Sequence, residues 1–183
     1  IPTAAAILCC LFLNQVNAAA FIGYENAPIG ITINGAEFGN QNLPGIYRRD
    51  YIYPTEQEVR YFAGKGVQLI QLPVRWERVQ QKIGAGLDAN QMALINNFIN
   101  TCKNYRVDVI ISIQNYGRYK INGIEYVLGS KQVPYNQFRE FWKSFAAALK
   151  QHENIYGFNI MAEPYNMGEG VWENAAQDAI YGI

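Results

Sequence analysis

Residues 155–164 read IYGFNIMAEP, a short apolar run that ends on one carboxylate, Glu163. Its β-branched and aromatic residues indicate a buried strand over 155–161. Pro164 lacks a backbone N–H and biases the preceding residue toward an extended conformation, so we expect Glu163 to be held at the strand exit. A carboxylate at the carboxyl end of a buried parallel strand is typical of catalytic groups in barrel folds. The alternative is a solvated residue that only opens a loop.

Three earlier apolar runs predict further strands. They cover 31–38, which ends at Gly39, then 67–72, which Pro73 cuts off, and 107–113. Each is short and rich in β-branched residues, as expected for strands that are buried on both faces of a sheet.

Helices are predicted between and after these strands. Thr55 and Glu58 form a Thr-x-x-Glu capping box that opens a first helix, and Gly66 closes it in the position of a left-handed cap. Asp88 caps a second helix, a third begins near Pro134, and a fourth covers 172–180. Apolar residues spaced three and four apart form the buried faces of the second and third helices: Met92, Ile95, Ile99 and Cys102, then Phe138, Phe141, Trp142, Phe145 and Leu149.

Four strand–helix units in succession predict an α/β fold with a parallel sheet, either doubly wound or a (β/α)8 TIM barrel. Gly35 and Gly39 lack the G-x-G-x-x-G spacing, which disfavours a dinucleotide-binding sheet. A whole barrel takes around 250 residues, whereas this chain has 183. We therefore expect a fragment that covers about the first four βα units, with residues 21–183 as the amino-terminal half of a barrel.

The composition excludes some classes of partner. The net charge is zero and half of the residues are hydrophobic, which suits a globular protein and suggests neither nucleic acid nor an anionic membrane surface as a partner. Aromatic residues make up 14% of the chain, with 13 tyrosines. This share suits either a surface that stacks on ring-shaped ligands or a well-filled core.

The amino terminus has the pattern of a secretory signal peptide, predicted over residues 1–20 and incomplete at its start. Residues 4–16 (AAAILCCLFLNQV) are apolar, and the alanines at 18–20 suit a cleavage site. We therefore expect a secreted, extracellular protein without membrane attachment after cleavage. Cys102 would be the one remaining thiol, a small buried hydrophobe, because Cys9 and Cys10 would leave with the signal. A lipoprotein anchor at Cys9 or Cys10 is the weaker alternative.

Several motifs together resemble glycoside hydrolase family five, the cellulase family. They are 66–80 (GVQLIQLPVRWERVQ), 115–119 (NYGRY) and 155–164, with AEFG, LPGIY, DYIYP and WENAAQDAI at 36–39, 43–47, 50–54 and 172–180. The resemblance spans essentially all of the chain after residue 20. It implies a secreted (β/α)8 barrel that cleaves β-1,4-glucan with retention, and a fourth-strand Glu, here Glu163, as acid/base. The nucleophile that it implies, a Glu on the seventh strand, lies beyond residue 183.

The sequence departs from the family pattern at polar positions. Gln71 replaces an Arg, Gln114 replaces a His, and Ala162 replaces the Asn before Glu163, while Ser112 stands where an Asp is common. An Arg beside a nucleophilic carboxylate favours its ionised form, which Gln71 cannot do. An Asn beside the acid can hydrogen-bond the sugar 2-hydroxyl, whereas Ala162 offers no polar atom.

The candidate site therefore consists of Glu163 as the catalytic residue, with substrate-binding residues at the other strand ends. Glu37, Gln71, Gln114 and Asn115 are the polar candidates, and Glu77 is more simply a structural partner of Arg75 or Arg78. The aromatic candidates, which would form platforms for sugar rings, are Trp76, Tyr116, Tyr119 and Tyr165.

Two functions stay open at this stage. The first is an endoglucanase-type hydrolase, and the second is a relative that binds β-glucan polysaccharide or oligosaccharide without cutting it. Neither requires a metal or a cofactor. With its altered motifs and a single confident carboxylate, the chain as printed is expected to be inactive.

Overall fold

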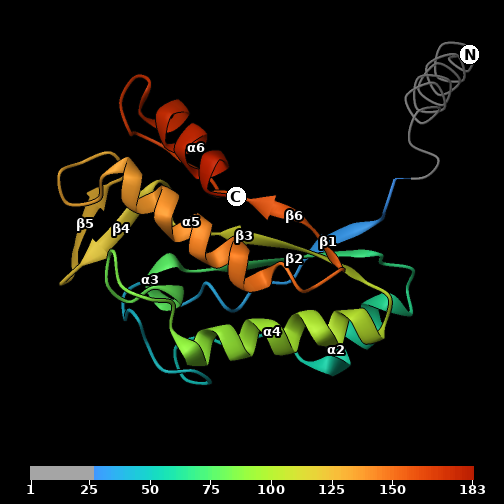
Figure 1. Ribbon diagram of the computed structural model, residues 1–183. Coiled ribbons are helices and arrows are strands. Elements are labelled where there is room, and N and C mark those ends of the chain that lie inside the picture. Colours follow the sequence, from blue (N-terminus) through green and yellow to red (C-terminus); the bar gives the residue numbers. More distant parts are fainter. Residues whose placement is uncertain (1–26) are drawn as a thin grey trace, which may run out of the picture.

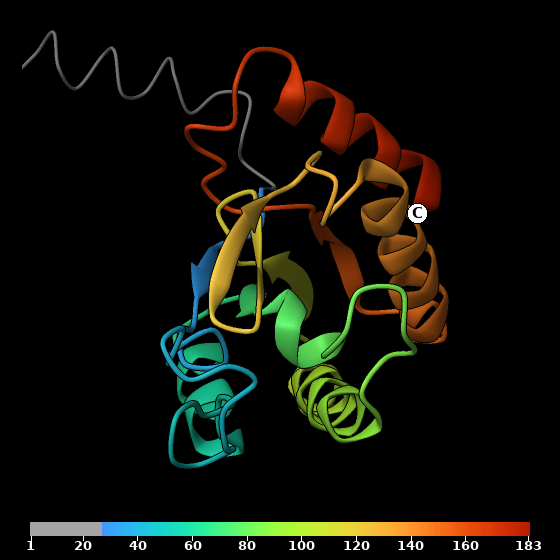
Figure 2. The ribbon, with the colours of Figure 1, turned by 90° about the vertical axis from the view of Figure 1, so that its left-hand side faces the viewer.

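The computed structural model describes residues 27–183, in which a four-stranded parallel sheet has the order β1-β2-β3-β6 (Figure 1). The strands of this sheet are β1 (Gly30–Thr32), β2 (Leu69–Val74), β3 (Asp108–Ile113) and β6 (Ile155–Asn159). The helices are α2 (Glu56–Ala63), α3 (Trp76–Val79), α4 (Ala89–Asn104), α5 (Tyr135–Leu149) and α6 (Val171–Gly182). In the turned view, α2, α4, α5 and α6 follow one another around the outside of the sheet (Figure 2). The expected succession of strand–helix units is thus confirmed.

The helix starts are the ones that the capping residues predict. The Thr55 backbone N–H donates to Glu58 Oε2 over 2.7 Å, and the Glu58 N–H donates back to Thr55 Oγ1 over 3.3 Å. Asp88 Oδ1 accepts from the Gln91 N–H at 2.9 Å, which caps α4. Such caps typically stabilise a helix by about 1 kcal/mol. The first helix ends at Ala63, earlier than expected, and Gly66 takes the predicted positive φ of 88° in the turn that follows.

The first expected strand, 31–38, is too long. Strand β1 ends at Thr32, and the chain turns at Gly35, where the Phe38 N–H donates to the Gly35 carbonyl oxygen. Gly35 has φ 142°, and a Cβ there would lie 2.9 Å from the Ile52 carbonyl oxygen. The apolar run therefore continues past the strand into a tight loop that only glycine can enter.

Pro73 does not end the second strand, as had been expected, because β2 runs on to Val74. The Gln71 carbonyl accepts from the Ile33 N–H, so the nitrogen of Pro73, two residues on, also points toward β1. Strand β1 ends at Thr32, which pairs with Gln71. Pro73 thus lies beyond the last β1–β2 pair, where its missing N–H removes no hydrogen bond of that ladder.

One face of the sheet packs on the helices and forms the core. Ile70, Leu72, Ile111 and Ile113 alternate along β2 and β3 and are fully buried. All members of the predicted apolar faces of α4 and α5 are fully buried except Met92, which is partly buried. Burial raises the pKa of the Cys102 thiol to about 12, in line with its expected role as a small hydrophobe.

A hairpin of β4 (Arg118–Ile121) and β5 (Ile124–Val127) was not predicted. It turns at Asn122 and Gly123, which have φ 49° and 81°. Asn-Gly is the preferred pair for a two-residue hairpin turn, so the sequence did carry the signal. The hairpin and α3 lie at the carboxyl end of the parallel strands, on the left in Figure 1.

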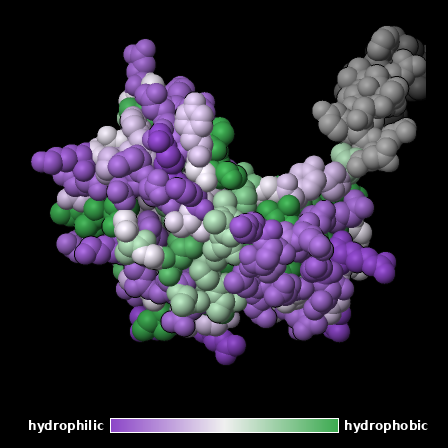
Figure 3. All heavy atoms as spheres, in the orientation of Figure 1, coloured by the Kyte–Doolittle hydropathy of each residue, from purple (hydrophilic) through white to green (hydrophobic). Residues whose placement is uncertain are grey.

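The predicted signal peptide, residues 1–20, lies outside the described residues. Within residues 27–183, no helix is both long and apolar enough to cross a membrane. On the face in Figure 3, hydrophilic side chains cover most of the periphery and apolar ones gather toward the middle.

Candidate active site

A cleft of about 880 Å³ opens at the carboxyl end of the sheet, and we call it the strand-end cleft. It is lined by residues that follow all four parallel strands: Thr32, Asn34, Glu37, Phe38, Gly39, Asn40, Gln71, Arg75, Gln114, Tyr116, Asn159, Met161, Ala162 and Glu163. Five of the nine candidate site residues are among them: Glu37, Gln71, Gln114, Tyr116 and Glu163. The parallel topology brings them together although they are far apart in sequence.

Glu163 reaches the cleft by a different backbone conformation from the expected one. Strand β6 ends at Asn159, and Glu163 has a positive φ of 51° instead of an extended backbone. A following proline disfavours right-handed helical backbone at Glu163, which leaves a left-handed turn as a second solution. The Ala162 N–H donates to the Ile113 carbonyl over 2.7 Å and ties this exit to β3. Positive φ in a residue other than glycine is uncommon and is found often at functional sites.

Gln71 and Gln114 line the cleft as predicted from their strand-end positions. Gln71 Nε2 donates to Thr32 Oγ1 over a long 3.4 Å, and the Gln114 backbone N–H continues the β3 ladder to Val74. The side chains present amide groups, which can bind sugar hydroxyls as donors or acceptors. They supply no charge.

Glu37 also lines the cleft, but its carboxylate is used within its own loop. Its Oε2 accepts from the Gly35 backbone N–H at 2.8 Å. The backbone carbonyl of Glu37 accepts from Arg75 Nε at 2.9 Å. Glu37 therefore holds the turn after β1 in shape, and Glu163 is the carboxylate of the cleft without such a bond among residues 27–183.

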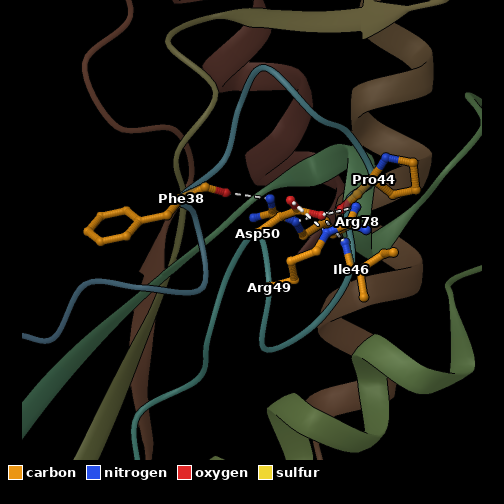
Figure 4. Close-up of polar contacts among 6 residues, drawn as sticks. All are labelled: Phe38, Pro44, Ile46, Arg49, Asp50 and Arg78. Carbon is orange, nitrogen blue, oxygen red and sulfur yellow. Dashed lines mark hydrogen bonds and ion pairs between the residues drawn. The ribbon is translucent and has the colours of Figure 1, made fainter.

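Arg78 clamps the loop that carries Glu37 and Phe38 (Figure 4). Its guanidinium donates to the carbonyls of Pro44 at 2.8 Å and Ala36 at 2.6 Å, and also to that of Phe38. Burial lowers the pKa of Arg78, and the guanidinium lies 3.9 Å above the Tyr51 ring. One buried side chain thus fixes three carbonyls of one cleft wall.

Asp50 closes the same loop from the other end. Its Oδ2 accepts from the Ile46 N–H at 2.6 Å and lies 3.0 Å from Arg49 Nη2. Hydrogen bonds from the Arg49 side chain and the Ile46 N–H lower the pKa of Asp50 to about 2. The carboxylate therefore stays ionised at any ordinary pH and keeps its two loop contacts.

Tyr116 and the exposed Phe38 are the aromatic residues that line the strand-end cleft, and Tyr165 lies beside Tyr116. The rings of Tyr116 and Tyr165 lie 6.3 Å apart in an edge-to-face arrangement, and Tyr165 is 53% exposed. Arg75 lies 5.3 Å from the Tyr116 ring centre, and Arg118 lies 4.2 Å from that of Tyr165. These cation–π contacts hold the two rings in place.

The expected role of Trp76 and Tyr119 as sugar platforms is wrong. Their exposed fractions are 0% and 2%, and the two rings pack edge to face with centres 4.9 Å apart. Both bind Gln80, Trp76 through Nε1 to the side chain and Tyr119 through its hydroxyl to the carbonyl. Burial also raises the pKa of Tyr119. Helix α3 turns the Trp76 ring into the core and strand β4 does the same for Tyr119, which residue type alone does not reveal.

Asn115 was expected to bind substrate, but both ends of its amide are used inside the protein. Oδ1 accepts from the Trp76 backbone N–H at 2.9 Å, and Nδ2 donates to Glu77 Oε2 at 2.6 Å. The other Glu77 oxygen accepts from the Lys120 backbone N–H at 2.8 Å. Glu77 is structural, as predicted, although its partners are Asn115 and Lys120 rather than Arg75 or Arg78.

Sequence reasoning missed Arg75 and Asn159 as cleft residues. Asn159 is the last residue of β6, and the register pairs it with Ser112, two residues beyond the Ile110 that pairs with Gln71. A period of two along the strands places the Asn159 side chain on the same face as that of Gln71, so the sequence pattern could have indicated Asn159. Across residues 27–183, no group of three His, Cys, Asp or Glu side chains could hold a metal ion.

A parallel sheet ringed by helices, with a polar cleft and a carboxylate at the strand carboxyl ends, defines an enzyme-like (β/α) barrel fold, here about four units of it. The sequence profile of the family described as Cellulase (glycosyl hydrolase family 5) matches residues 31–183. The chain belongs to this family, which confirms the resemblance found in its motifs.

Known relatives and solved structures agree with this assignment. Endo-beta-1,4-glucanase B of Emericella nidulans is 27% identical over 154 residues, which are 84% of this chain and 44% of the relative. Endoglucanase Cel5A of Pseudomonas stutzeri superposes with a TM-score of 0.80 at 35% identity, covering 86% of this chain and 48% of that chain. Endo-beta-1,4-glucanase Xac0029 of Xanthomonas axonopodis pv. citri gives a TM-score of 0.78 at 35% identity. The chain thus spans about half the length of these relatives.

Proposed function

We propose that the strand-end cleft binds β-1,4-linked glucan, and that Glu163 protonates the glycosidic oxygen where such a glucan is cleaved. The observation that carries the proposal is the position of Glu163 in the cleft, beside Gln71, Gln114 and Tyr116. Among similar solved structures, the Pseudomonas stutzeri enzyme is in complex with cellobiose and XacCel5A with cellopentaose. Amides that bind hydroxyls and an open aromatic ring suit a neutral sugar chain.

Hydrolysis with retention needs two carboxyl groups roughly 5 to 5.5 Å apart, one as acid and one as nucleophile. Glu163 fits the first role. Glu37 is the other acidic residue that lines the cleft, and its carboxylate already accepts from the Gly35 N–H. The 183 residues as printed should therefore bind glucan without cleaving it at an appreciable rate.

A glycan-binding relative without catalytic activity is the second candidate function. Ala162 beside Glu163 has no polar atom for a sugar 2-hydroxyl, and Gln71 is neutral where the family pattern has Arg. Binding needs neither group. Measured glucan cleavage in a completed barrel, as described in the Discussion, separates the two functions.

Secretion is part of the proposal. It is supported by the apolar run at 4–16 and the alanines at 18–20. Expression in a eukaryotic secretory host should release a product that begins near residue 21. A cell-retained product that still begins at Ile1 would refute secretion.

Calorimetric titration with cellopentaose and with maltopentaose tests the binding proposal. We expect binding of the β-1,4-linked sugar and at least tenfold weaker binding of the α-linked one, because the relatives with bound ligand hold β-1,4-linked sugars. Tyr116→Ala should weaken cellopentaose binding by about 3- to 10-fold through the lost ring contact. Tyr61→Ala, at an exposed tyrosine on α2, is the matched control and should have no effect. Equal affinity for both sugars would contradict the proposal.

A further inference from the structure

The strand-end cleft continues into a smaller hollow of about 130 Å³, which we call the side hollow. Asn40, Arg75 and Tyr116 line both spaces. Arg118 and Lys120 add two more cationic side chains to the side hollow. A sugar chain that lies across Glu163 can therefore extend over Arg75 into a more basic region.

Arg75 is the unusual residue at this junction. It is only 7% exposed, and its one hydrogen bond to another described residue joins Nε to the Glu37 carbonyl. No acceptor binds its two terminal nitrogens, and no carboxylate lies within ion-pair distance, among residues 27–183. Arginine does not lose its proton in proteins, so Arg75 presents to the two hollows a charge that no carboxylate among residues 27–183 pairs with.

The neighbouring arginines, Arg78 and Arg118, use their guanidinium nitrogens in hydrogen bonds to backbone carbonyls. Arg78 uses its nitrogens on three carbonyls. Arg118 donates to the carbonyls of Tyr116 and Tyr165, which fixes it against the loop. Arg75 alone among these three keeps both terminal nitrogens directed at open space, over a Tyr116 ring that holds the guanidinium in orientation. A guanidinium held in orientation with two free donors suits a ligand that supplies negative charge.

The carboxylates near the junction do not satisfy Arg75. In the side hollow, Glu77 is bound by Asn115 and the Lys120 N–H, and Glu125 lies 3.4 Å from Lys120 Nζ. In the strand-end cleft, Glu37 is bound to Gly35. Glu163 stands on the far wall of the cleft, after β6, and would repel an anion bound close to it. The favourable position for an anion is thus at Arg75, on the side of the hollow.

We propose that Arg75 binds a carboxylate carried by a sugar unit, so that the site takes β-1,4-linked glucan bearing uronic acid units in preference to the neutral polymer. This rests on the proposed function, because the same cleft binds the chain. A planar carboxylate accepts two parallel hydrogen bonds from a guanidinium, which a hydroxyl does not. Lys120 and Arg118 raise the local positive potential further.

The test compares two ligands of equal length, cellopentaose and the pentamer of β-1,4-linked glucuronic acid, by calorimetry at 20 mM NaCl. The wild-type chain should bind the acidic pentamer at least about tenfold more tightly. This preference should shrink at 300 mM NaCl, because part of it is electrostatic. Arg75→Gln should abolish the preference, measured as the ratio of the two affinities in the same variant. Arg60→Gln, an exposed arginine on α2, removes the same charge elsewhere and should leave the preference unchanged.

Each outcome is decisive. Wild-type affinity that is equal for both pentamers, with cellopentaose still bound, overturns the acidic-sugar inference and leaves the proposed function standing. Binding of neither pentamer overturns the proposed function and the inference with it. A preference that persists in Arg75→Gln overturns the role of Arg75. If Arg75→Gln fails to melt cooperatively, the wild-type ratio and its salt dependence still decide the matter. Tighter binding of a sulfated pentamer than of the carboxylated one would overturn the assignment to carboxylate.

Discussion

Asn115 Nδ2 donates to Glu77 Oε2 over 2.6 Å, which joins the loop after β3 to the helix α3 after β2. The same Asn115 amide accepts from the Trp76 N–H at the start of α3. Both residues are almost fully buried, and both oxygens of Glu77 are bound. The motifs that contain Glu77 and Asn115, which suggest sugar contact in the sequence, therefore stabilise the site through buried hydrogen bonds.

Asn115→Ala should destabilise the fold strongly. It leaves one oxygen of the buried Glu77 carboxylate and the buried Trp76 N–H without a partner, each worth about 1–3 kcal/mol. We therefore expect a loss of about 3 kcal/mol in the free energy of unfolding. Urea denaturation followed by tryptophan fluorescence measures it. Asn100→Ala, on the exposed side of α4, is the control and should change stability by less than about 0.5 kcal/mol. An Asn115→Ala loss as small as the control's would show that this bond does not support the site.

Arg78→Lys should loosen the wall of the cleft although it keeps the charge. Lysine cannot supply a fork of donors to the carbonyls of Ala36, Phe38 and Pro44, so at least two of them lose their partner. We expect a loss of about 2–4 kcal/mol in stability. Hydrogen exchange should show faster exchange across residues 35–51. Unchanged exchange in this loop would contradict the clamp.

His152 should make stability depend on pH in one direction. Burial, with a smaller effect of the Lys103 ammonium, lowers its pKa below the ordinary value of 6.5, and its Nε2 lies 2.8 Å from Asn96 Oδ1. The folded state therefore binds fewer protons than the unfolded state. Stability is complete above pH 6.5 and falls as the pH drops from 6.5 through the lowered folded pKa.

Thermal denaturation between pH 5 and pH 8 measures this effect, and His152 is the single histidine of the chain. His152→Gln should remove the change in melting temperature across this window, and an NMR titration of the wild-type ring should give the lowered pKa directly. A folded pKa above 6.5 would reverse the sign and refute the prediction.

The strands and helices could largely be predicted because local patterns determine them. Apolar runs gave the four parallel strands, and Thr55 and Asp88 gave two helix starts, since caps act within one turn. The end of a strand depends on its neighbour instead. Strand β2 can continue through Pro73 because β1 already ends at Thr32. The residue at which β1 ends lies 41 residues before Pro73 in the sequence.

The residues of the candidate site likewise differ in whether the sequence could predict their positions. Gln114 and Glu163 could be placed in the cleft because each follows a parallel strand, and Gln71 because it lies within one; the carboxyl ends of such strands meet at one edge. Trp76 and Tyr119 could not be placed, because an aromatic ring can fill a core as readily as it can stack on a sugar. The directions of α3 and of β4 decide that both rings are buried. Arg75 was missed as a cleft residue because the sequence suggested it as an ion-pair partner of Glu77, whereas it lines the cleft.

Glu163 is the residue on which cleavage should depend once a second carboxylate is present. We expect no appreciable hydrolysis of cellopentaose by residues 21–183, since general acid catalysis alone supplies only about 10²- to 10⁴-fold. Joining these residues to the carboxyl-terminal half of the Pseudomonas stutzeri relative, with Gln71→Arg, Gln114→His and Ala162→Asn, restores the polar groups of the family pattern. This chimera should release shorter oligosaccharides, measured by chromatography, and Ala162→Asn alone should not rescue the unjoined chain.

In the chimera, Glu163→Gln should lower the rate of cleavage by about 10²- to 10⁴-fold, because the amide cannot donate a proton to the leaving oxygen. Glu169→Gln is the matched control, since it removes an exposed carboxylate from the same loop and should leave the rate unchanged. A neutral substrate keeps this experiment independent of Arg75. Turnover by the unjoined chain, or a chimera that is indifferent to Glu163→Gln, would remove Glu163 from the role of acid and favour a binding protein or a different catalytic carboxylate.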